Sequence, residues 1–340
     1  MKTKLTTLFA ALLAVAGIAP AQAAEEVNVY SARKEYLLKP ALDRFTEQTG
    51  IRVNLITADA GPLLKRLESE GRNSPADVFI TTDAGRLHQA KAAGVLQPVE
   101  SEVLEKAIPS AYRDKDGYWF GLSLRARPIM YVKGRVDPAQ LSTYEALADS
   151  RWKGRICIRS SSNIYNQSLV ASMIASDGEE KTQRWLEDFV ANFARAPKGG
   201  DRDQIKAAVA GECDIAIANT YYLMYMLGGD DAEQKRIAEQ VNIFWPNQDG
   251  RGTHVNVSGA GVAAHAPNKE NAVKLLEFLV NDQSQEWYAE VNNEYPVKPG
   301  VPRSAVIESF GDFKQDSLNL STLGELNATA VKLMDKAGWK

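Results

Sequence analysis

A repeated alternation of short strand patterns with amphipathic helix patterns is the feature of this sequence that most restricts its fold. Residues 27–30 and 52–57 have the apolar or β-branched pattern of strands, and residues 36–48 between them carry apolar side chains at helical spacing. The strand and helix patterns continue through residues 62–93. This alternation predicts an α/β fold with a largely parallel sheet.

Two segments in the second half of the chain have the same design. Residues 155–159 and 213–218 are predicted strands, and each is followed by a polar turn and then a helix. The turns are residues 160–163 and the pair Asn219 and Thr220, and both are rich in residues that cap helices. In open α/β sheets, ligands bind outside the carboxyl ends of strands, where the following helices begin. We therefore expect the functional site at these two turns.

The first two dozen residues have the composition of an export signal. Lys2 and Lys4 give a basic start, residues 5–18 an apolar run, and residues 21–23 a small-residue cleavage site. We predict that residues 1–23 are a signal peptide. No cysteine stands at the cleavage point to carry a lipid anchor, and no later run approaches about 18 uncharged apolar residues. The expected location is the periplasm of a Gram-negative bacterium, without insertion into a membrane.

The predicted mature chain is too long for a single hydrophobic core. About 317 residues follow the signal peptide, whereas single cores stop growing near about 250 to 300 residues. A β-rich run at residues 124–133 is long enough to cross between two lobes. We predict two lobes joined by hinge strands: residues 24–126 with 255–300 form the N-terminal lobe, and residues 127–254 with 301–340 form the C-terminal lobe.

The charge pattern and the missing motifs exclude several classes of function. With 40 basic and 43 acidic residues the formal net charge is −3, and no basic run indicates nucleic acid or an anionic membrane surface. The sequence contains neither a G-x-S-x-G motif nor the paired carboxylate motif of a hydrolase. These features favour a receptor for a small molecule or an ion, and not an enzyme.

The two cysteines of the chain predict which strands are neighbours. Cys157 and Cys213 each stand eight residues before a tyrosine, Tyr165 and Tyr221 respectively. In an oxidising periplasm the thiols are expected to form a disulfide, which requires Cα atoms within about 7 Å. The bridge would bring the two polar turns to one edge of the sheet. The pair need have no role beyond stability, and this does not alter the geometric inference.

Tyr165, Tyr221 and Tyr222 are the candidate ligands at these turns. A phenol has an ordinary pKa near about 10, so a cluster of phenols has little use unless a cation favours the phenolate. Three phenolates cancel the charge of Fe³⁺, whereas the three histidines are scattered, which argues against zinc or copper. Tyrosines at helix starts are also often core residues with a hydrated hydroxyl, so the residues alone leave both explanations open.

Arg125 and Arg127 lie in the predicted crossover and are candidate anion ligands. Alternation along an extended strand puts both on one face, and a planar guanidinium suits a bidentate oxyanion. A salt bridge across the hinge is the alternative, and both explanations stay open. Ser161 and Asp201 begin helices whose N–H groups are further donors for an anion, although Asp201 is expected chiefly to cap its helix.

Several motifs resemble those of the bacterial periplasmic ferric-ion-binding proteins, also called bacterial transferrins. They span essentially the whole predicted mature chain. They are Asn-Val-Tyr-Ser-Ala-Arg at residues 28–33, Pro-Ala-Asp-Val at 75–78, Trp-Phe-Gly-Leu at 119–122, Arg-Ala-Arg at 125–127, the stretch from Cys157 to Tyr165, Gly-Gly-Asp-Arg-Asp-Gln at 199–204, Asn-Thr-Tyr-Tyr at 219–222 and Asn-Glu-Tyr-Pro-Val at 293–297. The paired tyrosines after a strand and the Asn-x-Tyr-Asn turn are specific to this group.

The resemblance implies the two-lobed periplasmic-binding-protein fold, type II, with Tyr165, Tyr221 and Tyr222 as ligands of Fe³⁺. It also implies delivery of the metal to an inner-membrane ABC permease by a receptor that we expect to be a monomer. Members with carbonate or bicarbonate in the iron shell suggest an anion partner here, with Arg125 as the first choice and Arg127 as the second.

The loop after the first strand departs from the family pattern. Lys34 and Glu35 stand where some members have a His-Tyr pair, so a metal ligand from the first lobe is in doubt. Tyr36 and Glu35 are the candidate first-lobe contacts, and an anion that fills the remaining positions is the more economical expectation. The alternative function is a receptor of the same fold for another small solute, such as a phosphonate, sulfate or a thiamine-like cation.

Overall fold

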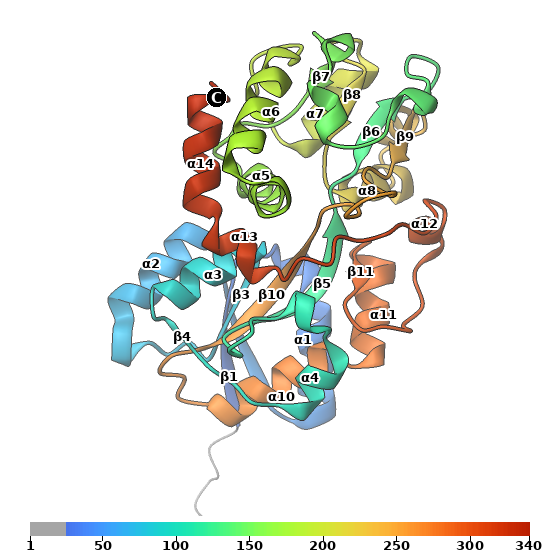
Figure 1. The fold of residues 1–340 in the computed structure, drawn as a ribbon. Coiled ribbons are helices and arrows are strands. Elements are labelled where there is room, and N and C mark those ends of the chain that lie inside the picture. The colour runs from blue at the N-terminus through green and yellow to red at the C-terminus, as the bar shows by residue number, and fades with distance from the viewer. Residues whose placement is uncertain (1–24) are drawn as a thin grey trace, which may run out of the picture.

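The computed structural model describes residues 25–340, so the predicted signal peptide at residues 1–23 lies outside the described residues. The chain folds into two α/β lobes, each built on its own sheet (Figure 1). The predicted two-lobed periplasmic-binding-protein fold is confirmed. In the described part of the chain, no helix is both long and apolar enough to cross a membrane.

The sheet of the first lobe has the strand order β11-β5-β10-β3-β1-β2, and β4 pairs with β10 beside this path. Its strands are β1 (Glu26–Ser31), β2 (Arg52–Thr57), β3 (Val78–Thr82), β4 (Leu96–Gln97), β5 (Phe120–Ala126), β10 (Val255–Ala263) and β11 (Tyr295–Pro296). β1 runs parallel to β2 and β3, but β10 is antiparallel to both β3 and β5. The sheet is therefore mixed and not largely parallel, because β10 enters it from the other lobe, against the direction of its neighbours.

The sheet of the second lobe has the order β7-β8-β6-β9. Its strands are β6 (Ile129–Val132), β7 (Ile156–Cys157), β8 (Ile215–Ile217) and β9 (Val241–Phe244). β7 and β8 run parallel, whereas β6 is antiparallel to β8 and β9. The two strand-to-helix units predicted from the sequence are thus neighbours in one sheet, and their carboxyl ends share an edge.

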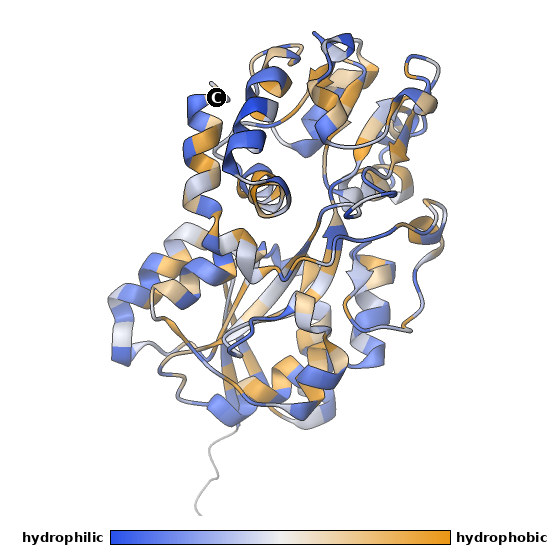
Figure 2. Ribbon diagram, in the orientation of Figure 1, coloured by the Kyte–Doolittle hydropathy of each residue, from blue (hydrophilic) through white to orange (hydrophobic). Residues whose placement is uncertain are grey.

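Helices surround both sheets, and Figure 2 shows many strand residues in apolar orange, with the blue polar residues gathered on the outer parts of the helices. Those that follow strands of the first lobe or pack beside its sheet are α1 (Lys39–Thr49), α2 (Ala60–Glu70), α3 (Ala84–Ala92), α4 (Glu102–Ala107), α10 (Lys269–Leu279) and α11 (Asp282–Val291). Those of the second lobe are α5 (Ile164–Asp177), α6 (Glu179–Ala191), α7 (Asp201–Val209), α8 (Thr220–Gly228) and α9 (Ala232–Ala238). The last three are α12 (Ala305–Glu308), α13 (Ser321–Glu325) and α14 (Asn327–Lys336).

The chain crosses between the lobes at strand ends. β5 passes directly into β6, and the break falls at Pro128, which has no N–H to donate to a ladder. The chain returns from β9 to β10, and a third segment runs beside this crossing, where the Thr253 N–H donates to the Lys314 carbonyl at 2.9 Å. α13 packs against both α3 and α5, and α14 packs against α5 and α6. The C-terminal segment therefore contacts both lobes (Figure 1).

Candidate functional site

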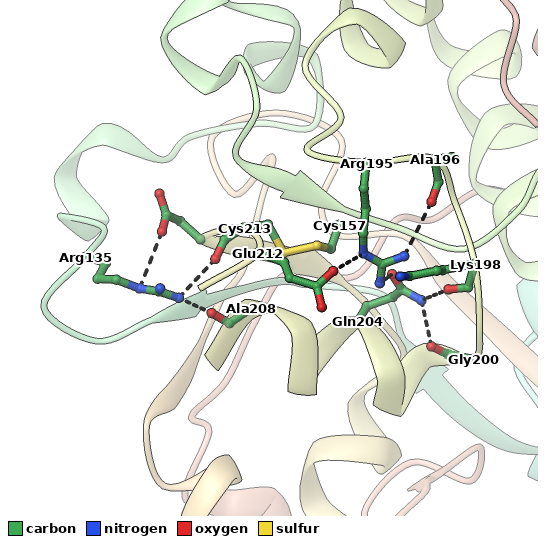
Figure 3. Close-up of a disulfide and its surroundings, with 11 residues drawn as sticks. Arg135, Cys157, Arg195, Ala196, Lys198, Gly200, Gln204, Ala208, Glu212 and Cys213 are labelled. Carbon is green, nitrogen blue, oxygen red and sulfur yellow. Dashed lines mark hydrogen bonds and ion pairs between the residues drawn. A yellow bond between two sulfur atoms is a disulfide. The ribbon is translucent and has the colours of Figure 1, made fainter. Parts of the chain in front are cut away.

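The disulfide expected from the sequence joins Cys157 to Cys213, with 5.9 Å between the two Cα atoms. Cys157 ends β7 and Cys213 lies just before β8, and both are buried. A side chain from another segment also stabilises the backbone at the disulfide, because Arg135 donates to the carbonyl of Cys213 at 3.0 Å (Figure 3). The prediction of a disulfide is confirmed. In the chain-entropy model a bridge across 56 residues stabilises the fold by on the order of 4 kcal/mol.

The three tyrosines singled out from the sequence all come from the first turns of helices that follow β7 and β8. Tyr165 is the second residue of α5, and its N–H donates to the side chain of the N-cap residue Asn163 at 3.1 Å. Tyr221 and Tyr222 follow Thr220 in α8, and their ring centroids lie 4.4 Å apart. All three side chains are half-buried. The parallel pairing of β7 with β8 is what brings these two helix starts together.

The phenols influence one another strongly. Burial, followed by the nearby phenols of Tyr165 and Tyr222, raises the pKa of Tyr221 well above its ordinary value. Burial, followed by the charges of Tyr165 and Asp201, raises the pKa of Tyr222 to about 12. Each shift reports that ionising one phenol beside the others is unfavourable without a compensating cation. The phenols of Tyr221 and Tyr222 are therefore neutral at neutral pH, and a highly charged metal ion could displace their protons.

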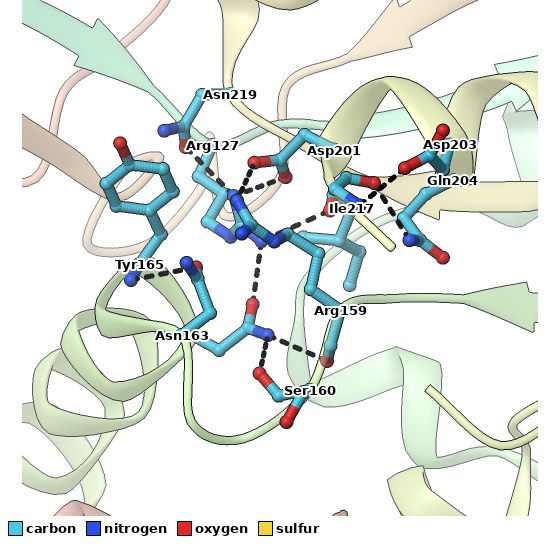
Figure 4. Close-up of polar contacts among 12 residues, drawn as sticks. Arg127, Arg159, Ser160, Asn163, Tyr165, Asp201, Asp203, Gln204, Ile217 and Asn219 are labelled. Atoms are coloured by element: carbon cyan, nitrogen blue, oxygen red, sulfur yellow. Dashed lines mark hydrogen bonds and ion pairs between the residues drawn. The ribbon is translucent and has the colours of Figure 1, made fainter. Parts of the chain in front are cut away.

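Arg127 joins the N-terminal ends of α5, α7 and α8 in the second lobe (Figure 4). Its terminal nitrogens donate to Asn166 Oδ1 at 2.6 Å, Asn219 Oδ1 at 2.9 Å and Asp201 Oδ1 at 3.1 Å, and also approach the carbonyl of Ile217 at 3.3 Å. The side chain is almost completely buried. Of the three guanidinium nitrogens of Arg127, Nε alone has no hydrogen-bond partner among the described residues. The geometry is that of a structural hub, with little capacity left for an external anion.

Arg125 has a different environment. Its side chain is 2% exposed, and its Nη2 lies 3.5 Å from Asp83 Oδ2. Nη1 is buried and has no hydrogen-bond partner within residues 25–340. The guanidinium carbon lies 5.4 Å from the centroid of the Tyr165 ring. A buried guanidinium nitrogen without a partner is destabilising, so binding an anion at Nη1 would be favourable. Arg125 therefore has the unused donor that an anion ligand requires.

A small, narrow pocket lies beside Tyr165. The residues that line it come from both lobes and from the hinge strands: Asp83, Arg125, Arg127, Tyr165, Asn219, His254 and Asn256. Burial and the nearby guanidinium groups of Arg251, Arg127 and Arg125 lower the pKa of His254 well below its ordinary value. The imidazole is therefore neutral, and the positive charge that faces this pocket comes from arginine.

Residues 41–315 match the profile of the bacterial extracellular solute-binding proteins. The chain belongs to this family. It is 54% identical over 316 residues to iron uptake protein A1 of Synechocystis, an alignment that covers 93% of this chain and 88% of the relative. The protein is accordingly a binding protein and not an enzyme, as predicted.

Solved structures of related proteins have the same fold. A Trichodesmium protein, IdiA or FutA, in complex with iron and citrate ligands superposes with a TM-score of 0.91 at 53% identity, covering 93% of this solute-binding protein and all of the neighbour. The ferric iron-binding protein A of Mannheimia haemolytica in an open conformation superposes with a TM-score of 0.87 at 46% identity, covering 93% and 99% of the two chains. The resemblance to ferric-ion-binding proteins inferred from the motifs is confirmed.

The predicted first-lobe contacts of this solute-binding protein make no hydrogen bond to the three tyrosines in the described part of the chain. Glu35 and Tyr36 belong to a short 3-10 helix after β1, and Tyr36 is 66% exposed. Tyr36 influences the titration of Tyr225, one turn beyond Tyr222 on α8. Within the described residues, no hydrogen bond joins Glu35 or Tyr36 to the three candidate ligands.

The prediction that Asp201 caps α7 was wrong, whereas Asn219 is the N-cap residue of α8 as predicted but makes no capping bond. Asp203, and not Asp201, caps α7, since its carboxylate accepts from the Gly200 N–H at 2.7 Å. Asp201 instead accepts from Arg127 and, at 3.0 Å, from Arg159. Asn219 stands at the start of α8 without a capping bond, because its side chain is engaged by Arg127. Buried arginines compete for these carboxylate and amide oxygens, and a charged donor makes the stronger bond.

Sequence reasoning missed two polar residues of this region. Arg159 follows β7, and its guanidinium carbon lies 5.8 Å from the centroid of the Tyr165 ring. Asp83 follows β3 and contacts the hinge and the second lobe. A charged residue within two positions of the end of a buried strand was the available signal in both cases.

In residues 25–340, no group of three or more His, Cys, Asp or Glu side chains is placed to hold a metal ion.

Proposed function

We propose that this protein is a periplasmic Fe³⁺ receptor of an ABC iron uptake system, with Tyr165, Tyr221 and Tyr222 as the metal ligands. The observation that carries the proposal is the convergence of three phenols beside a guanidinium group that has an unused buried donor. The names of the relatives support it, because they describe iron uptake and ferric-ion binding.

The chemistry of the cluster favours Fe³⁺ over other cargo. Three phenolates neutralise a trivalent ion, and hard oxygen ligands suit a hard cation. Because the pKa values of Tyr221 and Tyr222 are raised, these phenols carry no negative charge before a metal binds. The site, with positive arginines around it, therefore does not attract an unwanted cation. Binding then exchanges phenolic protons for metal.

Arg125 is the proposed partner of a small synergistic anion, carbonate or bicarbonate. The pocket beside Tyr165 is narrow and has no open space as large as a water molecule. Side chains must therefore move apart to admit an anion, and a small planar anion requires less movement than a large chelator. Citrate, which accompanies iron in the Trichodesmium relative, is the second candidate for the anion. Arg127 is committed to Asn166, Asn219 and Asp201 and is the weaker choice.

The proposed mechanism is capture on the second lobe followed by closure about the hinge strands. We assign residues 24–126 with 255–300 to the first lobe and 127–254 with 301–340 to the second. The first lobe then closes over the metal without supplying a ligand, which fits the exposed position of Tyr36. The closed form is the one that an inner-membrane permease would recognise. Metal shifts the population toward that form only as far as it binds the closed form more tightly.

Titration of the purified protein with ferric citrate tests the proposal. An orange-red colour from phenolate-to-iron charge transfer is expected, saturating at one equivalent of iron. The same titration with phosphonate, sulfate or thiamine by calorimetry provides the comparison. A protein that stays colourless under saturating iron and binds one of the other solutes would refute the iron assignment.

Arg125→Ala is expected to remove the response of the iron complex to added bicarbonate, because the variant lacks the proposed anion donor. The measurement is the intensity and position of the charge-transfer band during a bicarbonate titration. Arg202→Ala is the matched control, since Arg202 is an exposed arginine whose guanidinium lies 5.8 Å from the Tyr222 ring. A full bicarbonate response in Arg125→Ala would move the anion to another residue.

A further inference from the structure

Asp83 is a buried carboxylate at the point where the first lobe, the hinge and the second lobe meet. It stands at the N-cap of α3 and is 0% exposed. Its backbone has φ 86° and ψ 126°, a conformation that residues other than glycine rarely adopt. Such a strained backbone persists only where surrounding contacts stabilise it, and the side chain of Asp83 makes several such contacts.

The two carboxylate oxygens of Asp83 serve different parts of the molecule. Oδ1 accepts from the Gly85 N–H at 2.9 Å and from Ser168 Oγ at 2.7 Å. Oδ2 accepts from Asn256 Nδ2 at 2.9 Å and lies 3.5 Å from Arg125 Nη2. Oδ1 therefore contacts α5 of the second lobe, whereas Oδ2 contacts the hinge strands β5 and β10.

The contact with Ser168 crosses between the lobes and joins the helix of a proposed iron ligand. Ser168 lies three residues after Tyr165 on α5, so the two side chains are neighbours along the helix surface. Asp83 belongs to the first lobe, and its bond to Ser168 requires α3 and α5 to be in contact. The bond can form only in conformations that keep α3 and α5 in contact, whereas the contacts of Oδ2 lie within the first lobe and the hinge.

The contact with Arg125 orients the proposed anion donor. Nη2 of Arg125 contacts the Asp83 carboxylate, whereas Nη1 is buried without a partner among residues 25–340. The guanidinium lies close to the Tyr165 ring. A guanidinium is planar, so placing one nitrogen restricts the direction of the other. One carboxylate thus contacts both the group that would hold the anion and the helix that would hold the metal.

We infer that Asp83 is a positioning residue that couples lobe closure, through Ser168, to the orientation of Arg125 for the anion. The inference rests on the proposed function, in that the metal ligands and the anion donor are those assigned above. Asp83 itself contacts neither ion. Oδ1 of Asp83 stabilises the closed form through Ser168, and Oδ2 orients the guanidinium of Arg125. The two contacts use different oxygens and can be tested separately.

Ser168→Ala removes the cross-lobe bond alone. Alanine is a good helix former, and the iron ligands and Arg125 are untouched. Iron affinity is expected to fall by about 10-fold to 100-fold, the range for a hydrogen bond to a charged group, with the charge-transfer band at its wild-type position. The melting temperature without iron should be unchanged, whereas the increase on adding iron should be smaller. Ser176→Ala, an exposed position on the same helix, is the control.

Asp83→Asn breaks the hinge side and keeps the α5 side. The asparagine oxygen can still accept from Ser168, but its NH₂ group faces Arg125 Nη2 and Asn256 Nδ2, which are donors too. The bicarbonate concentration that half-saturates the spectral change is expected to rise several-fold. In Ser168→Ala this concentration should stay at the wild-type value.

Wild-type protein that gives no iron colour would refute the proposed function and not this inference. If the wild type does bind iron, unchanged affinity and unchanged iron-induced stabilisation in Ser168→Ala would overturn the closure half of the inference. An equal loss of stability with and without iron would show a merely structural bond and overturn it as well. A half-saturating bicarbonate concentration that stays the same or falls in Asp83→Asn would overturn the orientation half.

Discussion

Replacing Tyr222 by phenylalanine is expected to weaken Fe³⁺ binding by about two to three orders of magnitude and to leave the fold intact. Structural zinc sites with four ligands are worth on the order of 10–16 kcal/mol, so one ligand contributes about 3–4 kcal/mol, and each 1.4 kcal/mol is tenfold in affinity. The ring of Tyr222 packs against Tyr221 and the core of the second lobe, and phenylalanine preserves that packing. Only the ligand oxygen is lost.

Competition against a chelator of known affinity measures this loss, and circular dichroism checks the fold. Tyr225→Phe is the matched control, because Tyr225 lies one turn further on α8 and its hydroxyl makes a long hydrogen bond of 3.4 Å to the Val291 carbonyl. The control is expected to bind iron within a few-fold of the wild type. Equal affinity in Tyr222→Phe and Tyr225→Phe would remove Tyr222 from the metal site.

Iron affinity is expected to fall by at least about a hundredfold for each unit by which the pH is lowered below neutral. The pKa of Tyr222 is raised to about 12 and that of Tyr221 lies well above its ordinary value, so both phenols are protonated in the empty protein at neutral pH. Each must lose its proton to bind metal as phenolate. Every proton released contributes a factor of ten per pH unit, and acid therefore favours the empty state.

The dissociation constant is measured at several pH values against a chelator whose own pH dependence is known. A slope of at least two protons is expected from Tyr221 and Tyr222, and three if Tyr165 also ligates as phenolate. The same series on Tyr222→Phe should lose one proton from the slope. A pH-independent affinity in the folded protein would contradict phenolate ligation altogether.

Features set by local pattern were predictable from the sequence. The strands at residues 27–30 and 52–57 and the two strand-to-helix units of the second lobe follow from apolar periodicity and capping residues, and the structure contains all of them. The equal spacing of Cys157 and Cys213 from their tyrosines predicted that β7 and β8 are neighbours. That inference succeeded because a covalent bridge imposes a distance limit that can be stated without coordinates.

The different roles of Arg125 and Arg127 could not be predicted in the same way. Alternation along the strand predicted that both arginines lie on the same face. It did not indicate which of them would be available to bind an anion. The terminal nitrogens of Arg127 bind side chains that lie 39, 74 and 92 residues away in the sequence, whereas Arg125 Nη1 has no hydrogen-bond partner within residues 25–340. Such partners are invisible to any pattern that extends over a few residues. The same holds for Asp83, whose partners Ser168 and Asn256 lie 85 and 173 residues away.

The sequence alone therefore determined the α/β class, the two-lobed organisation, the neighbouring strands of the second lobe and the resemblance to ferric-ion-binding proteins. The tertiary structure decided that β10 enters the first sheet antiparallel, that Asp203 caps α7, and that Arg125 is the arginine with an unpartnered terminal nitrogen among the described residues. The reason is physical. Periodicity and capping act within one element, whereas the partner of a buried charge is chosen by how distant segments pack around it.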